Sequence, residues 1–216
     1  MPQNIASQEY DNHAAEYDAM SREAAPWVFF DKPYLESKLV PQLHSKTKLL
    51  ELGCGGGKVV EMLCKNNLKP DNVTGIDISK ELIKIAKSRM PAARLIVGDM
   101  VKTQVKKNYF DVALSVRSLE YLDIKDLKKV FENVYTQLKA LGKFYIIVGH
   151  PLRVNDGDIS RYLDRGARYV SLPWGMKVSL FHKIISDYIT AAISSGFTLN
   201  FIDEPKMPAL LKKKNP

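Results

Sequence analysis

The fold of this chain is decided by residues 48–58, which read K-L-L-E-L-G-C-G-G-G-K. The leucines predict a short buried strand, and the apolar pattern that begins at Val59 predicts a helix. The glycines between them let the backbone turn sharply and let a ligand approach the main chain closely. The start of the helix presents unpaired N–H groups that suit an anion. The stretch therefore predicts a site for a nucleotide-like or carboxylate-bearing molecule.

The spacing of the glycines separates this turn from two other nucleotide-binding turns. A dinucleotide fingerprint G-x-G-x-x-G that starts at Gly53 requires a glycine where Lys58 stands. A phosphate-binding P-loop ends in G-K-[ST], whereas Val59 follows Lys58 here. The remaining pattern, E-x-G-x-G-x-G, resembles the first motif of the class I S-adenosylmethionine-dependent methyltransferases. For the motif taken alone, a glycine-rich connection that serves only the fold is the alternative.

The length and composition fit one compact domain. The 216 residues are 45% hydrophobic and 26% charged, which is typical of a globular chain with a proper core. We expect no membrane span, no signal peptide and a cytoplasmic location. Cys54 and Cys64 lack metal or redox spacing, and they lie too far apart along one helix for a disulfide. The formal charge of +8 is only a weak hint of nucleic acid, because the lysines are scattered.

A second buried strand, Val73–Asp77, places an acidic residue where a ribose site needs one. Asp77 follows Gly53 by 24 residues, close to the spacing at which an acidic side chain accepts from both ribose hydroxyls. Two adjacent donors call for one acceptor with two oxygens. The alternative for Asp77, a charge at a helix start, is served better by Ser79 and Glu81. We therefore predict that Asp77 binds ribose.

The third and fourth strands carry the rest of the resemblance. The third strand is expected at Arg94–Val97, directly before Gly98-Asp99-Met100. In the family that the chain resembles, the residues after this strand hold adenine. The resemblance implies that Asp99 accepts from the adenine amino group while Met100 and Ile78 flank the ring. A loop-capping role for Asp99 is the alternative. After a fourth strand at 109–116, the resemblance puts the backbone of Val116 and Arg117 under the methionine moiety. A surface ion pair of Arg117 with Glu120 is the alternative.

Two helices are expected before the glycine turn, at Glu9–Asp18 and Pro26–Leu43. The first contains Y-D-N-H-A-A-E-Y-D, which is similar to a segment that closes over the cofactor in many methyltransferases. The resemblance makes Tyr17 a hydroxyl contact to the methionine end, whereas core packing is the simpler reading of Tyr10. The cofactor-binding residues that the resemblance implies are Tyr17, Glu51, Gly53, Cys54, Gly55, Asp77, Ile78, Asp99, Met100, Val116 and Arg117.

The fifth strand is expected at Phe144–Val148. We predict that the chain after it binds the methyl acceptor. Residues 151–180 are long for a connection, and such insertions are usually functional. We expect Phe181-His182-Lys183 to open a helix that ends at Gly196, and Phe197–Ile202 to form a sixth strand. The seventh strand of the family is expected to be missing or cut off by a truncation, because Met207–Lys212 is short and holds a proline. The candidate general bases are His182 and His150, and the candidate substrate pocket is formed by Tyr162, Tyr169, Trp174 and Phe181.

These elements predict a single α/β domain with a doubly wound, mostly parallel sheet. Residues 1–45 are expected to form a helical lid, 46–150 the cofactor-binding core, 151–180 a substrate cap, and 181–216 the last helix, the sixth strand and the tail. The later motifs resemble bacterial small-molecule methyltransferases, in the broad neighbourhood of the quinone-biosynthesis C-methyltransferases. The resemblance implies S-adenosyl-L-methionine as cofactor, S-adenosyl-L-homocysteine as product, and a small organic acceptor methylated on oxygen, nitrogen or carbon.

Two other functions remain as alternatives. A nucleic-acid methyltransferase is disfavoured, because the place of an N/D-P-P-Y/F turn reads Ser115-Val116-Arg117-Ser118 and neither cysteine follows a proline. A partner subunit that binds the cofactor without catalysis is the second alternative, since a fold does not guarantee activity.

Overall fold

The computed structural model describes residues 2–154, 158–172 and 176–206. Its main sheet has five strands in the order β3-β2-β1-β4-β5, and every neighbouring pair is parallel. The chain moves outward from β1 to β3 and then crosses back to β4, so the sheet has a switch point between β1 and β4. Ligands of such sheets bind beyond the carboxyl ends of the strands at that point. The strands are β1 (Leu49–Leu52), β2 (Val73–Asp77), β3 (Arg94–Val97), β4 (Phe110–Val116) and β5 (Leu138–Ile147).

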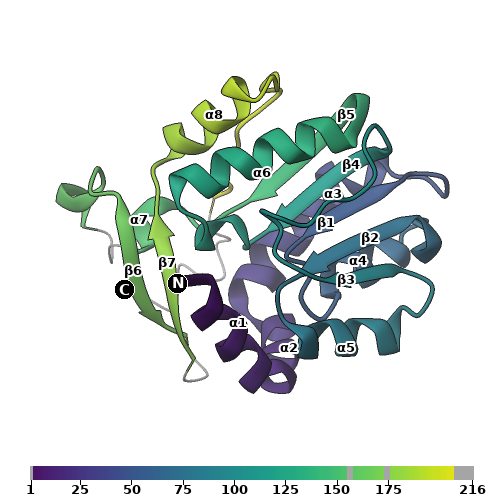
Figure 1. Cartoon of the computed structure of the whole chain (residues 1–216), viewed down its shortest axis with the longest axis horizontal. Helices are drawn as coiled ribbons and strands as arrows, with labels where there is room; N and C mark the ends of the chain where they lie inside the picture. The colour runs from purple at the N-terminus through teal and green to yellow at the C-terminus, as the bar shows by residue number, and fades with distance from the viewer. Residues whose placement is uncertain (1, 155–157, 173–175, 207–216) are drawn as a thin grey trace.

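Helices cover both faces of this sheet, as the sequence predicts, and each face has its own apolar core (Figure 1). Successive side chains of a strand point to opposite faces, so Leu49 enters one core while Leu50 and Leu52 enter the other. The first core includes residues of α3 (Lys32–Lys38), α4 (Lys58–Cys64) and α5 (Lys80–Arg89). The second includes residues of α6 (Ile124–Gln137) and α8 (Ile185–Ser194).

The segment before β1 is helical, but in more pieces than expected. The first helix is interrupted near His13 and becomes α1 (Pro2–Asn12) and α2 (Ala14–Glu23). The second becomes a π-helix η1 (Trp27–Asp31), α3, and a 3₁₀ turn η2 (Val40–Gln42). Pro41 lacks the N–H that would continue the α-helical ladder beyond Lys38, which accounts for that boundary.

The region after β5 differs most from the sequence prediction. After α7 (Pro151–Val154) and the 3₁₀ turn η5 (Ile159–Arg161), two strands form a separate antiparallel hairpin, β6 (Gly166–Ser171) and β7 (Lys177–His182). The expected helix start at Phe181 is therefore wrong, because Phe181 and His182 end a strand. The helix begins later, where the Asp187 carboxylate accepts from the Ile184 N–H at 2.9 Å.

The expected sixth strand at Phe197–Ile202 is also wrong, since these residues pair with no strand in the described chain. Side-chain packing holds them instead. The Phe197 ring lies 5.2 Å from that of Tyr135 and 6.0 Å from that of Phe131, and Phe201 lies 6.3 Å from Tyr145. Two predictions fall outside the described residues: the weak strand at 207–212 and the pocket role of Trp174.

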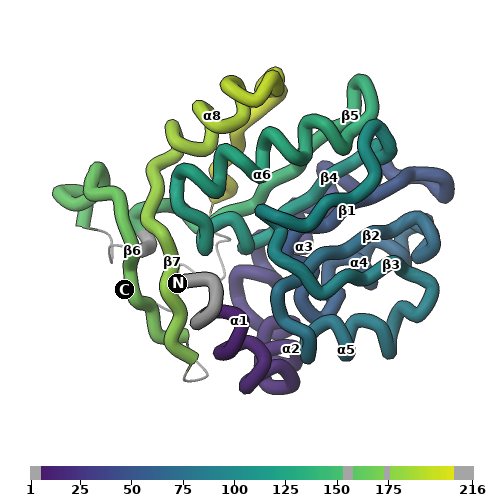
Figure 2. The backbone as a smooth tube through the Cα atoms, in the orientation of Figure 1, coloured from purple at the N-terminus to yellow at the C-terminus, as the bar shows by residue number. Residues whose placement is uncertain are grey.

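Helix α1 lies between the hairpin and the body of the domain (Figures 1 and 2). It contacts β7 on one side and α5 on the other, although these elements are far apart in the sequence. The Asp11 carboxylate ties it to the start of α5, accepting from the Ser79 hydroxyl at 2.6 Å and from the Glu81 N–H at 3.2 Å. The start of the chain thus closes over the carboxyl ends of the strands. No helix in the described ranges is long and apolar enough to cross a membrane.

Candidate functional site

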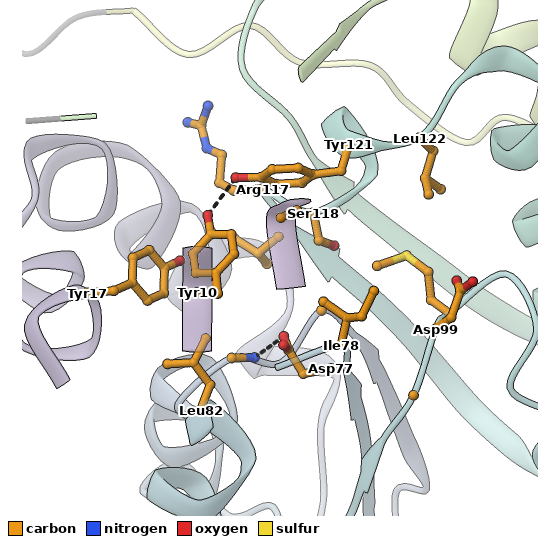
Figure 3. A pocket seen from close by; sticks show the side chains of 16 residues that line it. Tyr10, Tyr17, Asp77, Ile78, Leu82, Asp99, Arg117, Ser118, Tyr121 and Leu122 are labelled. Carbon is orange, nitrogen blue, oxygen red and sulfur yellow. Dashed lines mark hydrogen bonds between the residues drawn. The ribbon is translucent and has the colours of Figure 1, made fainter. Parts of the chain in front are cut away.

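A pocket lies at the carboxyl ends of the central strands, beneath α1 (Figure 3). Three tyrosines stand at one end, Asp77 lies in the middle, and Asp99 lies at the opposite end. Nine of the eleven residues that the resemblance implies for the cofactor line this pocket: Tyr17, Gly53, Gly55, Asp77, Ile78, Asp99, Met100, Val116 and Arg117. The structure thus brings together side chains from five separate stretches of the chain.

The glycine turn forms the floor of the pocket. The N–H groups of Gly53 and Cys54 both donate to the Ile76 carbonyl, at 2.8 and 3.0 Å, which fixes the turn to β2. Gly53 has φ +73°, a conformation that L side chains rarely adopt, and a Cβ at this position would overlap the Ser118 side chain. Glycine is therefore required at Gly53 both by backbone conformation and by space.

Asp77 ends β2 with its carboxylate directed across the turn. Its Oδ2 accepts from the Gly55 N–H at 2.7 Å, and its Oδ1 accepts from the Ser79 N–H at 2.9 Å. Burial raises the pKa of this carboxyl, while the backbone donors at Ser79 and Gly55 act to lower it. Each carboxylate oxygen has a second lone pair, so Asp77 can still accept two further hydrogen bonds.

Asp99 takes the loop-capping role that the sequence left as an alternative, while its contact with adenine stays a prediction. Its Oδ1 accepts from the Val101 N–H at 2.8 Å, which caps the turn after β3. Its buried Oδ2 accepts no hydrogen bond within the described ranges, although the Lys102 ammonium lies 3.3 Å away. Met100 and Ile78 line the pocket beside this carboxylate. An acceptor next to two apolar walls suits a flat ring that carries an N–H donor.

The tyrosine end of the pocket is built from α1, α2 and the turn after β4. The hydroxyls of Tyr10 and Tyr121 are 2.5 Å apart, and the rings of Tyr10 and Tyr17 meet edge to face at 4.8 Å (Figure 3). Burial raises the pKa of all three phenols, so their hydroxyls remain protonated at neutral pH. Tyr10, which the sequence favours as a packing residue, both packs and lines the pocket.

Arg117 connects the pocket wall to the N-terminal helices. It has φ +57°, which is uncommon for a residue other than glycine and concentrates at functional sites. Its guanidinium forms a two-point ion pair with the buried Asp31 of η1, at 2.8 and 3.1 Å. Glu120, the partner that the sequence suggests, instead accepts from the Gly149 N–H. The alternative that the sequence offered, an Arg117–Glu120 ion pair, is therefore wrong.

The other two residues that the resemblance implies, Glu51 and Cys54, are buried behind the pocket and do not line it. Burial raises the pKa of the Glu51 carboxyl well above its ordinary value, and the nearby Asp77 adds to that effect. Burial likewise raises the pKa of the Cys54 thiol. Both groups are therefore held neutral in the interior, and their place in cofactor binding stays a prediction.

The structure does not bring the two candidate bases into this pocket. His182 is buried at the end of β7, where its Nε2 lies 2.8 Å from the Tyr162 carbonyl. His150 is exposed after β5, and its Nε2 lies 3.4 Å from the Glu204 carboxylate. Catalysis by either histidine stays a prediction.

The three proposed substrate side chains that the structure describes also do not line the pocket. Tyr169 is 83% exposed on β6, while Tyr162 and Phe181 are partly buried around the hairpin. A substrate role for them would require the acceptor to extend from the pocket toward the hairpin.

Sequence reasoning missed several residues that line the pocket. Ser118 is the clearest: its hydroxyl donates to the Leu52 carbonyl at 2.8 Å and lies 2.6 Å from the Ser115 hydroxyl, which places it against Gly53. The S-x-x-S spacing at the end of β4 was a usable signal. The remaining missed residues are Ala6, Leu82, Gly98, Tyr121 and Leu122.

The order of the lining residues suits the parts of S-adenosylmethionine, although the cavity, at about 90 Å³, has room for only part of that molecule while α1 covers it. An adenine needs an acceptor between apolar walls, which Asp99, Met100 and Ile78 provide. A ribose needs a carboxylate in the middle, which Asp77 provides. The amino-acid end needs close access to the glycine backbone, and the glycine turn gives that access.

Comparison with known proteins agrees with this fit. Residues 50–146 match the family described as "Methyltransferase domain". A malonyl-[acyl-carrier protein] O-methyltransferase from Bacillus anthracis is 30% identical over 142 residues, covering 64% of this chain and 48% of that protein. A ubiquinone biosynthesis O-methyltransferase from Pelagibacter ubique is 25% identical over 155 residues, covering 72% of this chain and 50% of that protein. The chain thus spans about half the length of these curated relatives.

The solved structure of an S-adenosylmethionine-dependent methyltransferase from Mesorhizobium loti has the same fold. It superposes with a TM-score of 0.70 at 23% identity, covering 89% of this chain and 90% of that one. The predicted class I methyltransferase fold is confirmed, and residues 50–146 are similar to a methyltransferase domain.

Proposed function

We propose, from the similarity of residues 50–146 to a methyltransferase domain, that the protein transfers a methyl group from S-adenosylmethionine to a small organic acceptor. The observation that carries the proposal is the convergence of the glycine turn, Asp77 and Asp99 in one pocket at the switch point of the sheet. S-adenosylhomocysteine is then the product that leaves the site.

Binding of the donor is assigned to backbone and carboxylates. Asp77 would accept from both ribose hydroxyls through the lone pairs that Gly55 and Ser79 leave open. Asp99 would accept from the adenine amino group through Oδ2, with Met100 and Ile78 against the ring.

Catalysis is assigned to alignment and exclusion of water. When bound, the sulfonium supplies an activated methyl group, so the protein needs to hold the acceptor in line and keep water out. Helix α1 and the tyrosine cluster of Tyr10, Tyr17 and Tyr121 cover the methionine end of the pocket. Their aromatic faces also suit a positively charged sulfonium.

The acceptor is proposed to be small and to approach from the side of the hairpin. The names of the two curated relatives above describe O-methylation, of malonyl-[acyl-carrier protein] and in ubiquinone biosynthesis. Those names support a small-molecule acceptor or a small group on a carrier. The carboxyl end of β4 and the turn at Tyr121 and Leu122 line the pocket, and this turn contacts β7 of the hairpin.

Calorimetry followed by methyl transfer tests the proposal. We expect S-adenosylhomocysteine to bind the full chain with one site, and labelled S-adenosylmethionine to label the small-molecule fraction of a metabolite extract. Label in the RNA fraction would favour the nucleic-acid alternative, and donor binding without transfer to any extract would favour the inactive subunit. Binding of a nicotinamide dinucleotide or a nucleoside triphosphate in place of both adenosyl ligands would overturn the proposal.

A further inference from the structure

A second cavity, of about 300 Å³, lies between the N-terminal helices and α4. It is lined from the end of α2, from η1, from α3 and from α4, and it shares no lining residue with the pocket described above. Its volume is at the lower end of the range for small-molecule sites. We call it the Lys58 cavity, after the ammonium that distinguishes it.

The Lys58 cavity has more positive than negative side chains. Two carboxylates line it, and both are engaged. Glu61 pairs with Arg22 at 2.9 Å and with Lys65 at 2.9 Å, while Glu36 pairs with Lys32 at 3.2 Å. The fourth cation, Lys58, has no carboxylate within 4.0 Å anywhere in the described ranges. The cavity is therefore left with a cation that lacks a counter-ion.

The Lys58 ammonium is held in place without being neutralised. It donates to the Ser21 carbonyl at 3.0 Å and lies 5.0 Å from the centre of the Trp27 ring. Burial lowers the pKa of this ammonium to about 8, an effect that Asp31, Glu51 and Asp18 only partly offset from a distance. An anion would stabilise an ammonium in such surroundings, because its hydrogen bonds replace those of the water that burial removes.

The rest of the cavity suits an apolar body. Trp27 is 6% exposed and Met62 is 7% exposed, and both line the cavity beside Lys58. A flat or apolar group could pack on these two side chains while its charged end reaches the ammonium. A bare inorganic anion would leave these two side chains unused.

We propose that the Lys58 cavity binds a small organic anion, whose carboxylate or phosphate pairs with Lys58 and whose apolar part packs against Trp27 and Met62. Lys58 directly follows the glycine turn, and Trp27 belongs to the N-terminal layer. A ligand here therefore joins that layer to the core from outside the donor pocket. This site does not depend on the proposed methyl transfer.

Fluorescence of Trp27 tests the site directly. The chain has two tryptophans, so the Trp174→Phe variant of the full chain isolates the Trp27 emission. We expect phenyl phosphate to change this emission saturably, with a Kd on the order of 1 mM or tighter. Inorganic phosphate should bind more weakly, and phenol at matched ionic strength should give no saturable change.

Variants and a labelling experiment on unaltered protein separate the site from general charge effects. Lys58→Met in the same background should weaken phenyl phosphate by about tenfold or more, because a charge-assisted contact is lost. Lys84→Met, which removes an exposed lysine on α5, should leave the affinity unchanged. Phenyl phosphate should also protect Lys58 from acetylation in the natural chain. An unsaturable response, equal affinity in Lys58→Met, or unprotected Lys58 would each overturn the proposal.

Discussion

The structure of two regions of this domain can be predicted from the sequence to different degrees. Between β1 and β4, the strands, the glycine turn and the acidic residues lie where the sequence places them. After β5, a hairpin stands where a loop and a helix start were expected, and Phe197–Ile202 packs through aromatic rings where a strand was expected. The difference shows that positions fixed by local backbone chemistry are easier to predict than positions fixed by distant partners.

The first prediction concerns the turn, where local chemistry is strongest. Gly53→Ala should destabilise the fold by about 2–5 kcal/mol, because it combines a strained positive φ with an overlap against Ser118. Gly55→Ala is the matched control: it also has a positive φ, +52°, but its added Cβ meets no atom closer than 3.9 Å. The control should cost only about 1–2 kcal/mol. Urea unfolding measures both, and equal losses would contradict the steric argument.

The second prediction concerns Lys183, which joins the hairpin to the pocket wall. Its buried ammonium donates to the carbonyls of Leu122 and Phe181 at 2.5 and 2.9 Å. Burial lowers its pKa from 10.5 to about 8, while Glu120, Asp123 and Asp187 act to raise it. Below pH 8, Lys183 is charged in both the folded and unfolded states. Between pH 8 and 10.5 only the unfolded state keeps the proton, so the contribution of Lys183 to stability rises with pH.

The free energy of unfolding of the natural chain, minus that of Lys183→Met, should therefore increase as the pH rises from 7 to 9.5. The increase should not exceed about 3 kcal/mol. Other titrating groups cancel in this difference, since both proteins contain them. A difference that stays flat or decreases with pH would show that Lys183 is not held charged in a desolvated site.

The third prediction concerns the ribose position. Asp77→Asn should weaken S-adenosylhomocysteine binding by about 10- to 100-fold, because one acceptor and the negative charge are lost. Asp99→Asn should have a smaller effect, since it removes one contact at the end of the pocket rather than two in its middle. Calorimetry measures both affinities. An Asp77→Asn protein that binds as tightly as the natural chain would remove Asp77 from the site.

The fourth prediction concerns the hairpin. His182→Ala should destabilise the fold by about 1–3 kcal/mol, because it opens space and removes the contact to the Tyr162 carbonyl. Donor affinity should stay within about twofold, since His182 does not line the pocket. Intact stability with lost turnover would instead support His182 as the general base.

The smallest effect is expected at the surface of the same hairpin. Tyr169 is 83% exposed, so Tyr169→Ser should change the free energy of unfolding by less than about 0.5 kcal/mol. If it reduces acceptor turnover while donor affinity stays constant, Tyr169 belongs to the acceptor site despite its distance from the pocket. Steady-state kinetics with the identified acceptor makes that distinction.

The parts of the fold that the sequence predicts are those with a short-range cause. The helix after Asp123 is one: its spaced apolar residues Leu127, Val130, Phe131 and Val134 are all buried, and Asp123 caps it by accepting from the Asp126 N–H at 2.8 Å. The hairpin has no such local signature, because β6 is defined by its pairing with β7.

The candidate site divides in the same way. Gly53 is recognisable because the sharp turn requires glycine. Asp77 is recognisable because the two hydroxyls of a ribose require one acceptor with two oxygens. The Arg117–Asp31 ion pair joins residues 86 positions apart, so the sequence offered only a near neighbour, Glu120, as an alternative partner for Arg117. The contact of Tyr121 with Tyr10 joins residues 111 positions apart and forms because α1 folds back over the sheet.

The closure of the pocket by α1 has a kinetic consequence. A helix held by Asp11 at one contact and by the Tyr10–Tyr121 hydroxyls at another stands across the route to the strand ends. A ligand that enters or leaves on that side must wait for these few hydrogen bonds to open together. The association and dissociation rates of the ligand then depend on how long α1 stays closed over the pocket. A substitution of Asp11 would change both rates while the glycine turn at the floor of the pocket stays the same.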